Sequence, residues 1–409
     1  MNNYLYGTAF SVLLFTLAPG AQASQTDPVR NIESYALGDK IAGYVPSYSA
    51  LAVKNNYAVL VLETYTQAHK DSQVMQKTIA AFLANPSQYT LQSARSSWLN
   101  ARVSYLQTEA FRFYEGPIDY ANEETGEEGP EGRLNAWPLN EAFIDYVEGN
   151  ANSGLVNDVS FEVSAETIRA MDQVEDESDA TTGFHAIEFL LWGQDMNLTS
   201  PGNRSWKDYR AGEGNNDRRR IYLQTVTTML VEDLDSLVVA WSADNPDSYG
   251  STFKALDDKE ALGRILTALA TLSEFELAAE RIATGLDSGD QEDEQSCFSD
   301  NTLNDFIYDQ RGIRNVYFGS YGNISGAGID SLVAKLAPAL NIKMIAALNK
   351  VEDAMSRMPY PYDATLASPE GSPQRAAAES VIDALYNQSD VLKDIGKLLG
   401  VKVIVPVDG

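Results

Sequence analysis

Long stretches of helical periodicity constrain the fold of this chain more than any other feature of its sequence. Apolar residues recur at helical spacing, with few turn residues between them, over 53–84, 88–114, 165–174, 217–241, 259–286, 332–355 and 376–399. Alternating patterns typical of strands are nearly absent, and VKVIVPV at 401–407 is the one β-like run. The sequence therefore predicts an all-α fold built from helical bundles.

The length of the chain and one polar loop predict how the helices are divided. A chain of 409 residues, 44% of them hydrophobic, exceeds the size at which a single core usually stops growing. The stretch SADNPDSYGS at 242–251 separates two long helical stretches near the middle of the chain. We expect a signal peptide at 1–23, an N-terminal extension at 24–45, and helical bundle domains at 46–245 and 246–409.

The N-terminus predicts export. The first 23 residues carry no charged side chain, contain an apolar run at 10–18, and end in small residues before Ser24. That run is shorter than the roughly 20 residues that cross a bilayer, and no other apolar span is long enough. We therefore expect a periplasmic or outer-membrane-associated protein, released by cleavage of its signal peptide, with no transmembrane segment in the mature chain.

The net charge limits the classes of partner. A formal charge of −28 repels nucleic acid and anionic lipid, and it concentrates cations near the surface. We therefore expect no nucleic-acid partner, although such charge is equally typical of solubility or of adaptation to cold or salt. Cys297 is the only cysteine, so no disulfide can form within the chain.

The stretch ATTGFHAIEFLLWGQD at 180–195 is the strongest candidate for a functional site. It reads as a helix that is apolar on nearly every side, which is typical of a buried helix, yet it contains His185 and Glu188. Buried ionisable groups need a partner, and residues three apart on a helix are neighbours. One cation could bind both side chains, or the pair could bind each other and serve only the packing. Gly183 leaves room for a close approach of backbone or ligand.

The choice of metal follows from the available donors. The zinc-protease pattern is absent, because Phe189 stands where a second histidine would be required. His69 is the only other histidine, and its sequence context is that of an exposed helix position. One imidazole with carboxylates suits iron, manganese or a calcium-like ion, with zinc or another divalent metal as the alternative.

Further ligands must come from other helices. Glu109 lies among apolar and aromatic residues and is the best candidate, although it could instead pair with Arg112 or Arg102. A second, weaker acidic candidate is formed by Glu276 and Glu280, which share a helix face and could equally be solvated. Phe189 and Trp192, two aromatic side chains of the stretch 180–195, are expected to form walls of the pocket that contains His185 and Glu188.

Several motifs in order resemble the imelysin family of iron-regulated bacterial envelope proteins. They are GFHAIEFLLWGQD, which contains a G-x-H-x-x-E signature, QTEAFRFYEGPID with LNAWPLNEAFIDYV, and QEDEQSCFSDNT at 291–302. The resemblance implies two helical bundles with a pocket near their interface, lined by the signature helix. By matching motif it assigns functional positions to Gly183, His185 and Glu188, and also to Glu109 and Asp195. Gln295 stands where a histidine is expected in the third motif.

The resemblance implies two different activities, since the family is catalogued with metallopeptidases and its relatives take part in iron uptake. Our leading hypothesis is an exported protein of iron acquisition that binds a metal ion or a small metal-bearing ligand through His185, Glu188 and Glu109. The first alternative is a metallopeptidase that uses the same pocket. The second is a non-catalytic module that binds a protein partner in the envelope.

Overall fold

The computed structural model describes residues 49–122 and 124–406. All of these residues belong to one compact unit, Leu37–Gly409. The expected signal peptide at 1–23 and extension at 24–45 lie outside the described residues. The division into domains at 245 and 246 coincides with the loop after Trp241, and it stays a prediction.

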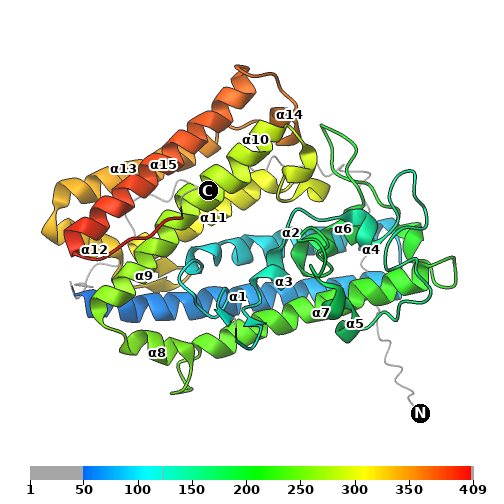
Figure 1. Cartoon of the computed structure of the whole chain (residues 1–409), viewed down its shortest axis with the longest axis horizontal. Helices are drawn as coiled ribbons and strands as arrows, with labels where there is room; N and C mark the ends of the chain where they lie inside the picture. Colours follow the sequence, from blue (N-terminus) through cyan, green and yellow to red (C-terminus); the bar gives the residue numbers. More distant parts are fainter. Residues whose placement is uncertain (1–48, 123, 407–409) are drawn as a thin grey trace, which may run out of the picture. The chain divides into compact units, whose positions relative to one another are not determined.

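Helices make up most of the described chain, and its strands form only two small hairpins, so the predicted all-α class is confirmed (Figure 1). The longer helices are α1 (Ala50–Ala84), α2 (Gln88–Leu106), α7 (Asn216–Trp241), α9 (Asp258–Thr271), α11 (Thr302–Phe318), α13 (Pro338–Met355) and α15 (Pro373–Leu399), with a π-helix, η4 (Leu272–Ala283), directly after α9. The shorter helices are α3 (Glu131–Asn135), α4 (Glu141–Ile144), α5 (Ala165–Met171), α6 (Gly183–Trp192), α8 (Tyr249–Ala255), α10 (Thr284–Ser288), α12 (Ile329–Leu336) and α14 (Asp363–Leu366).

Short irregular elements connect these helices. Single 3₁₀ turns occur at η2 (Glu109–Phe111), η3 (Trp206–Tyr209), η5 (Gln291–Asp293) and η6 (Cys297–Ser299). Two small antiparallel hairpins are formed by β1 (Ala121–Asn122) with β2 (Glu127–Glu128), and by β3 (Ser320–Tyr321) with β4 (Ile324–Ser325). None of the helices in the described ranges combines the length and the apolarity needed to span a membrane.

The helices pack in two groups that share one core. In the first group α1 packs against α2 and α7, and in the second α15 packs against α13, η4 and α9 (Figure 1). Helix α11 contacts α2 and α13, and α9 contacts α1 and α15, so both helices join the two groups. The buried apolar side chains of both groups form one connected cluster.

Local sequence signals explain where many of the helices begin and end. Ser87 and Ser164 each form a capping box with the threonine three residues later, at the start of α2 and α5. Pro338 occupies the first turn of α13, where a missing N–H has no cost, and Gly400 ends α15 in the left-handed conformation.

Three predicted segments differ from the structure. The helix expected at 88–114 ends at Leu106, where the chain tightens into the 3₁₀ turn η2 and then becomes extended at Arg112. The helix expected at 332–355 is broken at Ala337, which is extended as residues before proline usually are.

The third difference is the helix around η4. The single helix expected at 259–286 contains the π-helix η4, whose wider turns periodicity alone does not reveal. The β-like run at 401–407 forms no strand over its described residues. The backbone of Ile404 instead bonds to the side chains of Thr267 and Thr271 on α9.

Gly183 allows α6 to start close to another part of the backbone. Its φ is 85°, and a Cβ at this position would lie 2.7 Å from the carbonyl oxygen of Leu134. Both the left-handed backbone and the close approach require glycine.

We therefore expect Gly183→Ala to lower the free energy of unfolding by about 2 kcal/mol or more, since a side chain adds strain and a clash. Chemical denaturation measures the loss. Gly212→Ala is the matched control, because Gly212 has φ of 75° and nothing within 4 Å of an added Cβ. Equal losses in the two variants would show that the contact with Leu134 contributes nothing.

Candidate functional site

The signature helix α6 is buried along its whole length. All ten residues from Gly183 to Trp192 are buried, and the helix packs against α2, α3 and α7. It ends at Gly193, whose φ is 75°. The structure thus places His185 and Glu188 in the interior, as the apolar pattern predicts.

His185 and Glu188 bind each other, and Glu188 also binds a distant loop. His185 Nδ1 lies 2.8 Å from Glu188 Oε2, and the two side chains are 1% and 0% exposed. The other oxygen, Glu188 Oε1, accepts hydrogen bonds from the Ser299 N–H at 2.9 Å and from its hydroxyl at 2.6 Å. Both carboxylate oxygens are therefore engaged, whereas the buried His185 Nε2 has no hydrogen-bond partner.

Burial determines the protonation of this pair. Burial, together with the nearby charges of Arg102 and Arg281, lowers the pKa of His185 well below its ordinary value, so the imidazole is neutral at physiological pH. Burial raises the pKa of Glu188 well above its ordinary value, against the hydrogen bonds from Ser299. A protonated Glu188 would donate to His185 Nδ1 and leave the ring proton on Nε2. An ionised Glu188 can only accept, so that Nδ1 donates and Nε2 presents the free lone pair that a metal ion requires.

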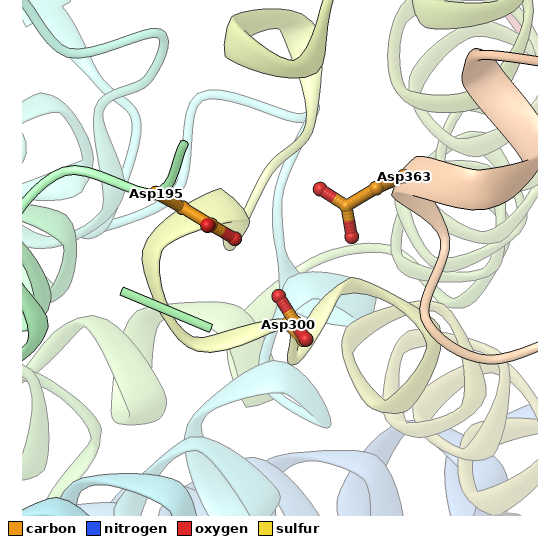
Figure 2. A group of neighbouring side chains, drawn as sticks. All are labelled: Asp195, Asp300 and Asp363. Carbon is orange, nitrogen blue, oxygen red and sulfur yellow. The ribbon is translucent and has the colours of Figure 1, made fainter. Parts of the chain in front are cut away.

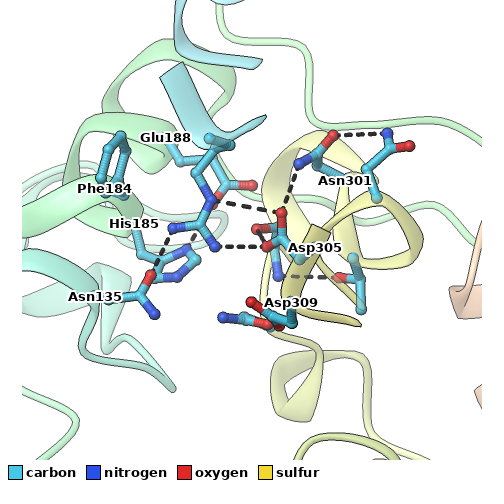
Figure 3. Close-up of polar contacts among 12 residues, drawn as sticks. Asn135, Phe184, His185, Glu188, Asn301, Asp305 and Asp309 are labelled. Atoms are coloured by element: carbon cyan, nitrogen blue, oxygen red, sulfur yellow. Dashed lines mark hydrogen bonds and ion pairs between the residues drawn. The ribbon is translucent and has the colours of Figure 1, made fainter. Parts of the chain in front are cut away.

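A buried arginine, Arg102, joins α2 to α11 through Asp305, which Figure 3 shows near His185 and Glu188. Arg102 is 0% exposed, and its Nη2 lies 2.7 Å from Asp305 Oδ2. Another of its N–H groups donates to Asn135 Oδ1. The remaining oxygen of Asp305 accepts a hydrogen bond from Asn301 at 2.7 Å. Arg102 therefore neutralises Asp305 and places a positive charge close to His185.

Glu109 lies in a second arginine network. Its Oε2 accepts from Arg112 Nη1 at 2.7 Å and from Arg281 Nη2 at 2.6 Å, while the buried Oε1 has no partner. Burial acts to raise the pKa of Glu109, but the charges of Arg112 and Arg281 prevail and lower it to about 2. In the described part of the chain, Glu109, His185 and Glu188 do not form a set of ligand atoms within 4.8 Å of one another.

Arg281 connects the weaker acidic candidate to the same network. It bonds to Glu276 and to Asp309, with Nη2 2.6 Å from Glu276 Oε1 and Nη1 2.7 Å from Asp309 Oδ2. Arg112 also lies 3.6 Å from Glu276, so two guanidinium groups compensate this carboxylate. Glu280 is exposed.

The aromatic side chains of α6 pack in the protein core. Phe189 lies against Phe298 and under the guanidinium of Arg204, with centroid distances of 5.3 Å and 4.9 Å. Trp192 packs edge-on against Trp98 at 5.4 Å. These contacts hold α6 against its neighbours.

His69 lies on α1 and is partly buried. Its Nδ1 lies 3.6 Å from Asp235 Oδ1.

The structure brings Asp195 into a cluster with two aspartates that the sequence analysis missed (Figure 2). Asp195 follows α6, Asp300 follows η6, and Asp363 begins α14. One oxygen from each lies within 4.8 Å of the others. Burial and the neighbouring carboxylates raise the pKa of Asp300 to about 8 and that of Asp363 to about 6.

No local pattern marks Asp300 or Asp363 as a ligand. Asp300 adopts a left-handed φ of 56°, which aspartate tolerates better than most residues, and it lies within the third motif. Asp363 stands 63 positions further along the chain, in the segment YPYDATL. Only the tertiary fold brings the two together.

Comparison with known proteins places the chain among imelysins. Residues 61–392 match the model of the family described as Imelysin, peptidase family M75. The chain is 26% identical over 358 residues to iron-regulated protein A of Synechococcus elongatus, covering 85% of this chain and 81% of that protein.

Two solved structures share the fold. One is described as a candidate iron-regulated protein A precursor from Parabacteroides distasonis, with a TM-score of 0.66, 18% identity, and coverage of 88% of this chain and 97% of that one. The other is an imelysin-like protein from Psychrobacter arcticum, with a TM-score of 0.60, 16% identity, and coverage of 88% and 99%.

The arginine network predicts how stability depends on Glu109 and on pH. Since the pKa of Glu109 is about 2 in the folded protein, below its ordinary value of 4.5, its stabilising effect is complete above pH 4.5 and is lost as the pH falls toward 2. We expect Glu109→Gln to cost about 3 kcal/mol at pH 7, because it leaves buried guanidinium groups undercompensated.

Denaturant unfolding of the wild type and Glu109→Gln at pH 7, 5 and 3 measures this effect. The difference should be full at pH 7 and 5 and smaller at pH 3. Glu379→Gln, on the exposed face of α15, is the control and should change little. A difference that stays constant down to pH 3 would contradict the assignment to the ionised carboxylate.

Proposed function

Because this chain belongs to the imelysin family, we propose that it is an exported protein of iron acquisition that binds a metal ion, iron foremost, through His185. The observation that carries the proposal is the free Nε2 of a neutral, fully buried imidazole whose other nitrogen is held by Glu188. Metal-binding histidines usually direct their second ring nitrogen to a carboxylate in this way. In this arrangement Glu188 orients the ligand and need not bind the metal itself.

Carboxylate oxygens are available in the same polar interior. Glu109 Oε1 and Asp309 Oδ1 are buried without hydrogen-bond partners, and both residues bind Arg281, whose charge acts on His185. One imidazole with carboxylates is a donor set that suits iron. Since these atoms do not already lie within 4.8 Å of one another, metal binding requires side-chain rearrangement. A metal must also compete with the arginines for Glu109.

The geometry favours binding over hydrolysis. A metallopeptidase needs a metal-bound water and a general base that can reach it. Glu188 is the carboxylate nearest to His185, and its two oxygens are engaged by His185 and Ser299. Peptide cleavage that is sensitive to chelators and lost in Glu188→Gln would support the peptidase alternative.

An acidic groove favours the alternative of an envelope interaction module. The groove lies between the segment 118–132 and the loop that follows α5, and it contains no basic side chain among the residues that line it. Its carboxylates belong to Asp119, Glu128, Glu131, Asp172, Glu175, Asp176 and Glu177. This surface suits a basic partner, whose binding would weaken with salt and would be independent of His185.

Metal titration tests the leading proposal. We expect calorimetry of the metal-free mature chain to show binding of ferrous, ferric or zinc ions, and His185→Ala to abolish the binding event. Glu188→Gln should weaken it by about 10- to 100-fold, as loss of an orienting carboxylate does. His69→Ala is the matched control and should bind as the wild type does. Wild-type affinity in His185→Ala would contradict the proposal.

A further inference from the structure

Three aspartates from separate parts of the chain meet in the interior beside the end of α6. Asp195, Asp300 and Asp363 are 6%, 3% and 0% exposed, and Figure 2 shows their carboxylate groups directed toward one another. Their nearest oxygens all lie within 4.8 Å. Like charges at this separation repel strongly when water is excluded.

The oxygen atoms of these aspartates are largely without partners. Both oxygens of Asp300 and both of Asp363 are buried with no hydrogen-bond donor. One oxygen of Asp195 accepts the Asn197 N–H at 2.9 Å, and the other has no donor. Burying a carboxylate in this state is costly unless a cation compensates it.

A fourth carboxylate gives independent evidence for a missing positive charge. Glu294 is 1% exposed, and neither of its oxygens makes a well-formed hydrogen bond, although Thr302 and Asp363 are polar neighbours. Besides burial, the charges that raise its pKa come from Asp363 and Asp300, so it faces the same cluster. The group therefore contains four buried acidic side chains.

Other buried carboxylates of this protein are compensated by arginine. Asp145 binds both Arg204 and Arg219, and Asp305 binds Arg102. In the described ranges no such donor bonds to Asp300, Asp363 or Glu294. The fold thus supplies guanidinium groups to several of its buried carboxylates, whereas no arginine bonds to this cluster in the described part of the chain.

We propose that Asp195, Asp300 and Asp363 form a binding site for a hard divalent cation, calcium best of all, with Glu294 at its edge. All the donors are oxygens, which suits calcium, magnesium or manganese rather than a softer metal. Calcium binds six to eight oxygens at about 2.3–2.6 Å, so oxygens around one ion lie up to about 5 Å apart, as they do here. Magnesium demands a stricter octahedron and retains more water.

Such a cation would link three segments that the chain connects only at long range. Asp195 extends from the end of the signature helix, whereas Asp300 and Asp363 belong to the C-terminal half. The site is separate from His185, which lies two turns earlier in α6 and uses different donors. Calcium would therefore stabilise the fold without supplying a ligand to the iron site.

Thermal unfolding of the chelator-treated mature chain tests the proposal. We expect millimolar calcium to raise the melting temperature by about 3 °C or more, because a ligand that binds only the folded state stabilises it. Magnesium should have a smaller effect. Bound terbium should luminesce on excitation of tyrosine, since Tyr362 directly precedes Asp363, and calcium should quench that signal by displacement.

The variants separate this site from the one at His185. Asp300→Asn and Asp363→Asn should each abolish the calcium shift and the terbium signal, yet melt no lower than the wild type without calcium, because each removes a buried carboxyl group whose ionisation in this cluster is unfavourable. His185→Ala should retain both signals while losing iron binding. The absence of a calcium shift in the wild type, or its persistence in both asparagine variants, would overturn the proposal.

Discussion

Buried guanidinium groups that reach between distant segments are the constraint on which the rest of this structure depends. Arg281 binds Glu109, 172 positions away, and Arg102 binds Asp305, 203 positions away. Neither arginine is exposed, so each bond must be made well or the charge would destabilise the core. These bonds fix how η4 and α11 lie against α2 and η2, and they set the electrostatic environment of His185. Burial keeps the imidazole of the signature helix neutral, and these two positive charges add to that effect.

Much of the architecture follows from local pattern. The apolar periodicity located α1, α7 and α15 within a few residues, because a long helix that buries one face must repeat its apolar positions. The errors lie where a single residue or a wider turn interrupts that repeat. Pro338 divides one predicted helix, and the π-helix η4 adds a residue per turn inside another. Residues 401–406 have the alternating apolar pattern of a strand, yet they form none, because no neighbouring strand pairs with them.

The candidate site was predictable only where its parts are close in sequence. His185 and Glu188 are one helical turn apart, and their apolar setting already implied a buried pair. Glu109 was predicted as a metal ligand, but its carboxylate binds Arg112. The sequence already offered this ion pair, because Arg112 lies three residues away. The contribution of Ser299 and the convergence of Asp300 with Asp363 depend on tertiary contacts across 111 and 63 positions. A single sequence contains no signal for such pairs.

Ser299 and Asp300 are consecutive residues that serve different sites. The first holds Glu188 through its N–H and hydroxyl, and the second turns through a left-handed φ of 56° into the aspartate cluster. Adjacent Cα atoms are separated by about 3.8 Å, so a backbone displacement at one residue moves the other unless φ and ψ rotate to offset it. An ion that draws Asp300 inward would shift the groups that orient His185. If calcium binding changes the affinity of His185 for a metal ion in this way, thermodynamic reciprocity requires that a metal ion at His185 changes the affinity for calcium by the same factor.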